Sequence, residues 1–61
     1  MNELTLKEND VFIYNGDNVV FSRAEYRANF MYETYIKRSG KEEYIGLILG
    51  SKLNKVEQEV K

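Results

Sequence analysis

The chain contains no cysteine and no histidine. Without cysteine, it can form neither a disulfide nor a thiolate metal site. Without histidine, it lacks the commonest neutral metal ligand and the commonest general base. It also has no phosphate-binding loop, no glycine-rich dinucleotide motif and no nucleophile–base set. The sequence therefore predicts a protein that is not an enzyme, with no catalytic residue, no metal site and no cofactor.

Long apolar runs and a strong excess of one charge are also absent. No segment approaches the ~18 continuous apolar residues of a membrane-spanning helix. The first residues, Met-Asn-Glu-Leu, lack the basic and apolar regions of a signal peptide. The net charge of −1 indicates affinity for neither a nucleic acid nor a membrane. We therefore expect a cytoplasmic protein that does not bind membranes.

The short length limits how much surface the chain can bury. Its 61 residues allow one small domain, residues 1–61. A chain of this size buries only about 60% of its unfolded surface, so disulfides, a metal or oligomerisation usually add stability. Since cysteine and histidine are missing, we expect the chain to self-associate, most simply as a homodimer.

The N-terminal third has the pattern of a β-hairpin. Val11–Tyr14 and Val19–Phe21 are rich in β-branched and aromatic residues. Asn15-Gly16 lies between them, and both residues tolerate a positive φ, which a tight hairpin turn requires. Residues 3–7 alternate between polar and apolar and predict a further short strand, followed by a turn at residues 8–10.

The middle of the chain has the pattern of a helix over residues 22–40. Ser22 is a favourable N-cap and Gly40 a favourable residue just beyond the C-terminus. At helical spacing, one apolar stripe consists of Ala24, Ala28, Met31 and Tyr35. Tyr26 and Phe30 lie almost opposite that stripe. A helix with two apolar faces is expected to be covered on both sides, within its own fold or by a second copy.

Residues 44–49 are compatible with two structures. They form an apolar segment that ends at Gly50-Ser51, as a buried strand would. They can also open a second helix that runs to about Val60. The residues at one helical phase are Ile45, Leu49, Leu53, Val56 and Val60. That continuity favours the helix, although each glycine costs it roughly 1 kcal/mol relative to alanine.

The expected fold is therefore α+β. It consists of an N-terminal β-hairpin or three-stranded antiparallel meander followed by two helices, in the order ββ(β)αα. The residues expected to face the core are Leu4, Leu6, Val11, Ile13, Val20, Ala24, Ala28, Met31, Tyr35, Ile45, Leu49, Leu53 and Val56.

Two pairs of residues are candidates for an interface. Tyr26 and Phe30 are neighbours on the surface of the expected helix, and aromatic residues are enriched in interface cores. Burial against the second helix is the better explanation if residues 42–60 are helical. They form a partner surface if residues 44–49 are a strand. Gly46 and Gly50 have the spacing that allows two helices to approach closely, or they mark a strand that ends in a turn.

A small basic cluster supports a different class of function. Arg23, Lys37, Arg38 and Lys41 crowd the expected first helix and its C-terminal end, where they could contact phosphates. Cations at a helix C-terminus also stabilise the helix through its dipole, which explains the cluster without a ligand. The sequence pI of about 5.3 makes this second explanation the stronger one.

These observations predict a small non-enzymatic protein–protein interaction module. We expect it to dimerise and to regulate or inhibit another, unidentified protein. The bias toward lysine, glutamate and asparagine is typical of small orphan reading frames of phages and mobile elements, which would place it in the host cytoplasm. The alternative is a small nucleic-acid-associated regulator that uses the basic end of the first helix.

Overall fold

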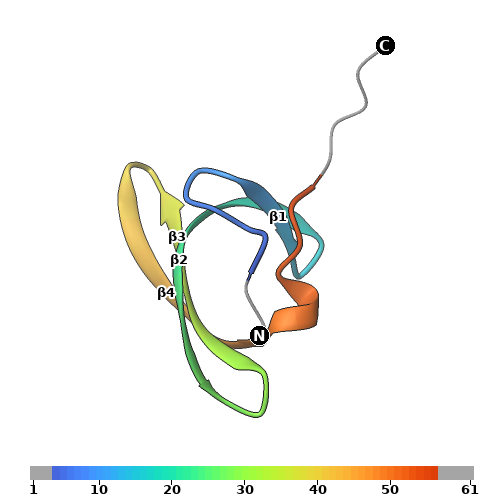
Figure 1. Ribbon diagram of the computed structural model, residues 1–61. Helices are drawn as coiled ribbons and strands as arrows, with labels where there is room; N and C mark the ends of the chain where they lie inside the picture. Colours follow the sequence, from blue (N-terminus) through green and yellow to red (C-terminus); the bar gives the residue numbers. More distant parts are fainter. Residues whose placement is uncertain (1–3, 57–61) are drawn as a thin grey trace.

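The computed structural model describes residues 4–56, and within that range the chain forms a four-stranded antiparallel sheet. The strands follow one another in space in the order β1-β2-β3-β4, so the sheet is a simple meander (Figure 1). The elements are β1 (Val11–Tyr14), β2 (Asp17–Ala28), β3 (Met31–Arg38), β4 (Lys41–Leu49) and the 3-10 turn η1 (Gly50–Lys52).

Three two-residue turns connect the four strands. Both residues of each turn have a positive φ: 52° and 83° at Asn15-Gly16, 56° and 64° at Asn29-Phe30, and 54° and 75° at Ser39-Gly40. Two central residues with positive φ define the type I′ turn, whose twist matches that of the strands it joins. These turns make each strand fold back directly onto its predecessor.

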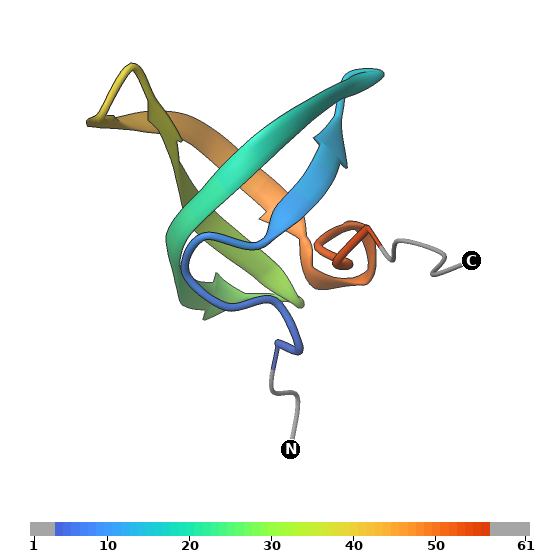
Figure 2. The same ribbon diagram turned by 90° about the horizontal axis from the view of Figure 1, so that it is seen from above.

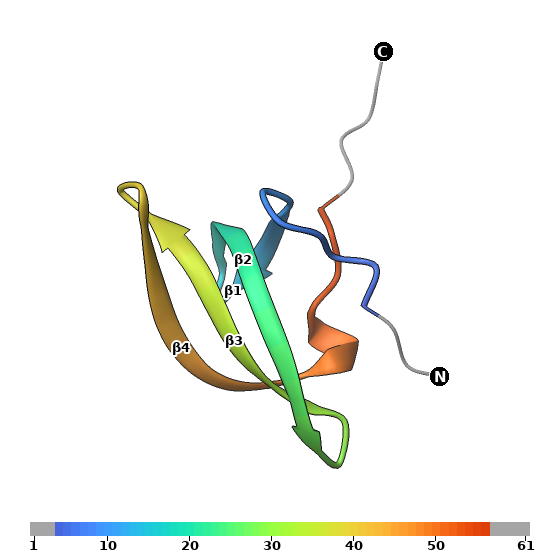
Figure 3. The ribbon, with the colours of Figure 1, turned by 60° about the vertical axis from the view of Figure 1, so that its left-hand side comes forward.

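The sheet is strongly curved. The β2–β3 pairing shifts register between Phe21 and Arg23 and again between Tyr26 and Ala28, and the β3–β4 pairing shifts beside Tyr35. Such bulges bend a strand and increase its twist. Figures 2 and 3 show the result: β2, β3 and β4 form a curved layer, and β1 and η1 lie across its concave side.

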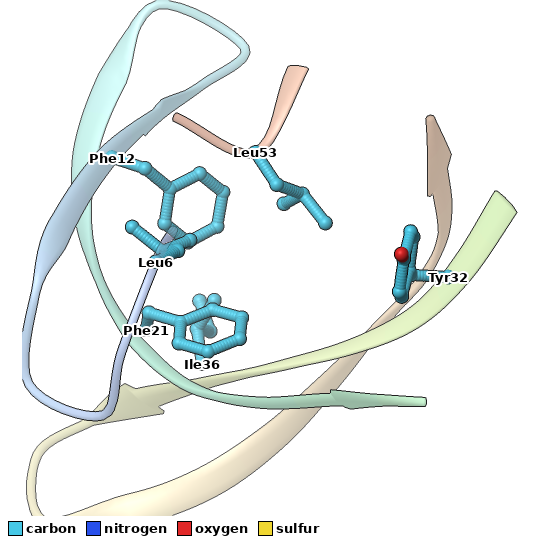
Figure 4. Close-up of a cluster of buried hydrophobic side chains, with 6 residues drawn as sticks. All are labelled: Leu6, Phe12, Phe21, Tyr32, Ile36 and Leu53. Carbon is cyan, nitrogen blue, oxygen red and sulfur yellow. The ribbon is translucent and has the colours of Figure 1, made fainter. Parts of the chain in front are cut away.

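The core fills the concave side of the sheet. It consists of the buried side chains of Leu6, Phe12, Phe21, Tyr32, Ile36 and Leu53 (Figure 4). The ring of Phe12 meets that of Phe21 edge to face, with centroids 6.0 Å apart. Alternate residues of β3 point inward, because side chains alternate between the two faces of a strand. Thr34, the buried residue between Tyr32 and Ile36 on β3, donates a hydrogen bond from its hydroxyl to the carbonyl of Tyr32 over 3.1 Å.

The segments that precede and follow the four strands in the sequence complete the core. Residues 4–10 precede β1 and contribute Leu6, and backbone hydrogen bonds join Asn9 and Asp10 to Phe21. After η1, Leu53 enters the core. The N–H of Val56 then donates to the carbonyl of Val11 over 2.7 Å, beside an isolated antiparallel bridge between Phe12 and Lys55. The free edge of β1 is thus covered in part by residues 55–56.

The predicted hairpin and its turn are confirmed. Val11 pairs with Val20 and Tyr14 with Asp17 around Asn15-Gly16. The predicted turn at residues 8–10 is also present, closed by a hydrogen bond from the N–H of Asp10 to the carbonyl of Lys7. The predicted strand over residues 3–7 is wrong, because residues 4–7 form no strand.

The α+β prediction is wrong, because residues 4–56 contain no α-helix. The predicted helix over residues 22–40 is the second half of β2, a turn and β3. Its apparent cap, Ser22, lies inside β2, and Gly40 belongs to a hairpin turn. Residues 44–49 are part of β4, the alternative to a second helix. Residues 57–61, where that helix would have ended, lie outside the described range.

The predicted core was correct at both flanks and only partly correct in the strands. Leu6 and Leu53 are buried, as expected. Ala24 and Ile45 pack against the core as expected, whereas Ala28 and Leu49 are exposed.

In β1, however, Phe12 is buried and Ile13 is half-exposed, the reverse of the prediction. Val11–Tyr14 is apolar at every position, so either alternate set could have faced inward. A shift of one residue exchanges the two faces of a strand, and the larger side chain, Phe12, occupies the core.

Candidate functional site

An open groove separates the two edge strands of the sheet. This β1–β4 groove has a volume of about 480 Å³. It is lined by Phe12, Ile13, Tyr14, Asn15, Met31, Leu47, Ile48, Leu49 and Lys52. Phe12 and Ile48 belong to the core or pack against it and therefore form the floor. Lys52 is the one charged residue among these lining residues, so the groove is predominantly apolar.

Apolar side chains are exposed along both sides of this groove. Leu47 is 53% exposed, Ile13 50% and Leu49 40%. Leu49 lies opposite Met31 in the β3–β4 pairing, so Met31 extends this surface onto β3. We call Ile13, Met31, Leu47 and Leu49 the apolar rim. Exposed apolar residues that cluster beside a groove, rather than singly, mark an interaction site.

The backbone of β4 is unpaired along the groove. Among residues 4–56, β4 pairs only with β3. Arg38 and Lys41 close a two-residue turn, so their pair is hydrogen-bonded, and such pairs alternate along an antiparallel ladder. Tyr32 lies an even number of residues before Arg38 on β3. The pair of Tyr32 and Ile48 is therefore also joined by backbone hydrogen bonds. The N–H and C=O groups of Leu47 and Leu49 therefore point away from β3, toward the groove.

One contact closes the groove at its far end. The hydroxyl of Tyr14 on β1 donates a long hydrogen bond of 3.4 Å to the carbonyl of Ile45 on β4. Ile45 lies where β4 has one more residue than β3, next to Gly46, which has a φ of 103°. Glycine adopts that conformation without a steric penalty. The bulge and Tyr14 limit the open edge of β4 to the residues that follow Gly46.

Three of the four predicted interface residues meet at one corner of the sheet. The N–H of Phe30 lies 3.5 Å from the hydroxyl of Tyr26, and the N–H of Gly50 donates to the carbonyl of Phe30 over 2.8 Å. Tyr32 lies between them, with its ring centroid 5.3 Å from that of Tyr26. Gly46 lies apart, in the bulge of β4. Of the two interpretations of these glycines, the helix–helix contact is wrong, because Gly46 lies within β4. The strand that ends in a turn is confirmed, because Gly50 begins η1 directly after β4.

A second groove runs beside residues 4–8. It has a volume of about 810 Å³ and is lined by Leu4, Leu6, Lys7, Glu8, Phe21, Ser22, Arg23, Ala24, Tyr26 and Tyr32. The half-exposed Tyr26 is part of this groove, whereas Phe30 is not among its lining residues. Its lining mixes charged and apolar side chains. The segment that borders this groove is already hydrogen-bonded to β2 through the backbone of residues 9 and 10.

Ion pairs cover the outer face of β2 and β3. Arg27 donates to Glu33 over 2.7 Å, and Arg23 bonds to Glu25 and, over 3.2 Å, to Glu42. The guanidinium carbon of Arg23 also lies 3.9 Å from the centroid of the Tyr35 ring, a cation–π contact.

Two carboxylates in this network are stabilised in their charged form. The hydrogen bond from Arg27 holds the pKa of Glu33 below its usual value. The hydroxyl of Ser22, 2.7 Å away, and then the charge of Arg23 lower the pKa of Glu42. Neither carboxylate is among the lining residues of the two grooves, and each is paired with an arginine.

The predicted phosphate-binding residues are mostly paired with carboxylates. Lys37 bonds to Glu8 over 2.7 Å and to Asn9 over 2.8 Å. Arg38 bonds to Glu43 over 2.8 Å, and Arg23 belongs to the network above. Among the residues that the structure describes, Lys41 makes no ion pair. Lys37, Arg38 and Lys41 do lie together at one hairpin end, but adjacent carboxylates offset their charge.

The sequence prediction missed the apolar rim. Ile13, Met31 and Leu49 were expected in the core, and Leu47 was not assigned a role. The available signal was the uncharged segment Tyr44–Leu49: in a strand of this length, half of its side chains must lie on the face away from the core. Only the edge position of β4 shows that this apolar face remains open.

The part of the chain that the structure describes shows neither a metal-binding cluster nor a membrane-spanning helix. Residues 4–56 contain no cluster of three or more acidic side chains that could hold a metal ion. Over the same residues, no helix is long and apolar enough to cross a membrane. No family model matches the chain, and neither a curated protein nor a solved structure is significantly similar to it.

Proposed function

We propose that the protein is a small non-enzymatic protein–protein interaction module that acts through the apolar rim. The observation that carries the proposal is the open apolar edge of β4. Leu47 and Leu49 are exposed in both side chain and backbone, beside Ile13 across the groove. Natural sheets usually cover such an edge or protect it with charge. An edge left apolar and open is suited to contact with another chain.

The charge distribution along β4 supports this assignment. The first part of the strand carries Lys41, Glu42 and Glu43, which protect that part of the edge. The segment after Gly46 carries no charge until Lys52. The protein therefore protects one half of this strand and leaves the other half available to a partner.

We extend the proposal to a regulator or inhibitor of another protein that forms a homodimer in the cytoplasm, or in the host cytoplasm if a phage or mobile element encodes it. Small size and the absence of histidine and cysteine support a role in binding rather than in catalysis. The corner formed by Tyr26, Phe30 and Gly50 offers a separate apolar surface for the dimer contact, with Phe30 58% exposed.

The alternative, a nucleic-acid-associated regulator, has weaker support. Its residues Arg23, Lys37 and Arg38 are engaged by glutamates. A phosphate would have to displace those carboxylates, and the chain as a whole carries a net negative charge.

Replacement of Leu47 and Leu49 by serine tests the proposed function. Both side chains are exposed, so we expect the variant to keep its fold by circular dichroism. The wild-type protein should be retained by its partner in affinity purification from its native host, and the variant should lose that retention. Self-association measured by light scattering should be the same for both proteins, because the dimer contact is assigned to the separate corner of Tyr26, Phe30 and Gly50. Tyr44→Ser is the matched control, because Tyr44 is equally exposed on β4 but packs against Tyr35 beyond the bulge. Equal retention of wild type and the double variant would reject the proposal.

A further inference from the structure

The β1–β4 groove has the properties of a position that one more strand could occupy. On one side, Leu47 and Leu49 present unpaired backbone groups. On the other side lie Ile13 and Tyr14 of β1. The floor between them is apolar and formed by Phe12 and Ile48. An extended segment placed here would have a hydrogen-bonding edge beside it and an apolar surface beneath it.

We infer that this groove binds a single extended segment of a partner protein, which adds to β4 as an antiparallel strand over residues 47–49. The inference rests on the proposed function and specifies the partner's chemistry. The antiparallel direction continues the arrangement of the whole sheet, and antiparallel pairs are slightly more stable per residue than parallel ones.

The walls of the groove favour a single segment over the edge of a second copy. A second copy pairing through its own β4 would bring β3 along with it, and β1 and Lys52 stand where that strand would lie. A volume of about 480 Å³ is a space for a few side chains, not for a folded sheet. The groove therefore differs from the Tyr26–Phe30 corner, which is an open surface.

The alternation of a strand determines what the segment must carry. Residues that face the floor would contact Phe12 and Ile48, and those that face outward would lie beside Leu47, Leu49 and Ile13. Apolar β-branched residues suit the floor positions. The outward positions tolerate small polar residues such as threonine, because the rim is open to water.

Lys52 selects the charge at one end of the segment. It lies at the end of the groove where β4 passes into η1, and it makes no ion pair among residues 4–56. The antiparallel direction brings the N-terminal end of the bound segment next to Lys52. A glutamate or aspartate at that end would pair with it. At the other end, the contact between Tyr14 and Ile45 stops the segment.

The test uses a synthetic capped peptide in which valine alternates with threonine after an N-terminal glutamate. It is titrated into the isotopically labelled protein while amide chemical shifts and hydrogen exchange are followed. We expect the amides of Leu47 and Leu49 to shift and to become protected from exchange, and Glu25 on the outer face of β2 to stay unchanged. The Leu47→Ser/Leu49→Ser variant should lose binding, and Tyr44→Ser should retain it.

A charge exchange tests the orientation without risk to the fold. Lys52 is exposed, so Lys52→Glu should weaken binding of the glutamate peptide by up to about fivefold, the effect of one exposed ion pair. A peptide with lysine in place of glutamate should recover the loss. Equal affinity of both proteins for both peptides would overturn the assigned direction and partner charge.

Two results would overturn the inference as a whole. Peptide-induced shifts confined to the groove lined by Leu4, Lys7 and Tyr26 would place the binding site elsewhere and leave the proposed function standing. Absence of any peptide-induced shift, in a protein whose retention by a native partner nevertheless depends on Leu47 and Leu49, would also reject strand addition and leave the proposed function standing. If the protein neither bound the peptide nor depended on Leu47 and Leu49 for retention by a partner, strand addition and the proposed function would both be rejected.

Discussion

Gly50 lies against the ring of Tyr32 so closely that a Cβ at residue 50 would be 2.8 Å from Tyr32 Cε1. The contact fixes η1 against β3, and the Gly50 N–H bonds to the carbonyl of Phe30 beside it. We therefore expect Gly50→Ala to lower the free energy of unfolding by about 1–3 kcal/mol, the cost of overpacking a filled site. Urea unfolding measures this change. Gly40→Ala is not a suitable control because Gly40 has a positive φ, but Ser51→Ala should change stability little. An unchanged Gly50→Ala variant would contradict the close contact.

Phe30 occupies the second position of a type I′ turn with a φ of 64°. This conformation costs a bulky residue roughly 1–2 kcal/mol, and glycine adopts it without that cost. Phe30→Gly should therefore stabilise the protein by about 1 kcal/mol, which in a domain of this size corresponds to a rise in melting temperature of roughly 4–8 °C. Calorimetry of the wild type and of Phe30→Gly measures this difference in melting temperature. The reverse change at an equivalent turn position, Gly16→Phe, should destabilise. If Phe30→Gly lowered the melting temperature, the side chain would have to contribute more in contacts than the turn loses in strain.

Phe12 and Ile13 are adjacent in β1 but lie on opposite faces of the sheet. Phe12 is fully buried, so Phe12→Ala should cost about 3–5 kcal/mol. That loss is comparable to the whole stability available to a core of this size. We expect Phe12→Ala to be largely unfolded in water at 25 °C and Ile13→Ala to remain folded, as judged by circular dichroism and denaturant titration. The opposite order would mean that β1 presents its other face to the core.

The lowered pKa values of Glu33 and Glu42 predict loss of stability in acid. Both carboxyl groups release their proton more readily in the folded state than in the unfolded chain, where the usual value is 4.5. Their contribution is therefore fully present above that value and disappears as the pH falls through the lower folded-state pKa. Urea unfolding at a series of pH values should show this decline below about pH 4.5. The double variant Glu33→Gln/Glu42→Gln should be less stable at neutral pH and should lose less stability on acidification. If the free energy of unfolding fell with pH in the same way for the wild type and the double variant, Glu33 and Glu42 would not be the cause of the loss.

The pairing of Lys37 and Arg38 with glutamates predicts weak binding to nucleic acid. In a titration with duplex DNA at low and at moderate salt, we expect low affinity and a shallow salt dependence, since few phosphates can be neutralised. Glu8→Gln/Glu43→Gln frees both cations and should steepen the dependence. A steep salt slope for the wild-type protein, abolished by Arg38→Ala, would restore the nucleic-acid alternative.

The sequence specified its first hairpin more clearly than the rest of the sheet. Asn15-Gly16 between two β-rich runs has few other interpretations. Residues 22–40 satisfied two patterns at once. Ser22, Gly40 and the spaced alanines fit a capped helix, while Tyr32, Thr34 and Ile36 alternate as in a strand. The signal against a helix was Asn29, which lies in the middle of the expected helix and is the first residue of the turn between β2 and β3. Ser39-Gly40 fits the end of a helix as well as a hairpin turn, so it did not distinguish the two structures.

The candidate site was less accessible to sequence analysis than the fold. Tyr26, Phe30 and Gly50 were predicted as interface residues, and the structure brings them together through the turn at residues 29–30. Leu47 and Leu49 could not be identified in the same way. An apolar residue on a strand is normally buried, and its exposure here depends on β4 having no neighbour beyond it, which only the complete topology determines.

Leu6 and Leu53 are both almost fully buried, yet neither belongs to a strand of the sheet. The sheet therefore presents an unfinished apolar surface until residue 53 has joined it, even though its hairpins form from local turns. During synthesis on a ribosome, a chain that ends before Leu53 would hold Phe12 and Ile36 exposed to other chains. Productive folding must then wait until Leu53 has left the exit tunnel, and any shorter growing chain is exposed to aggregation until that point.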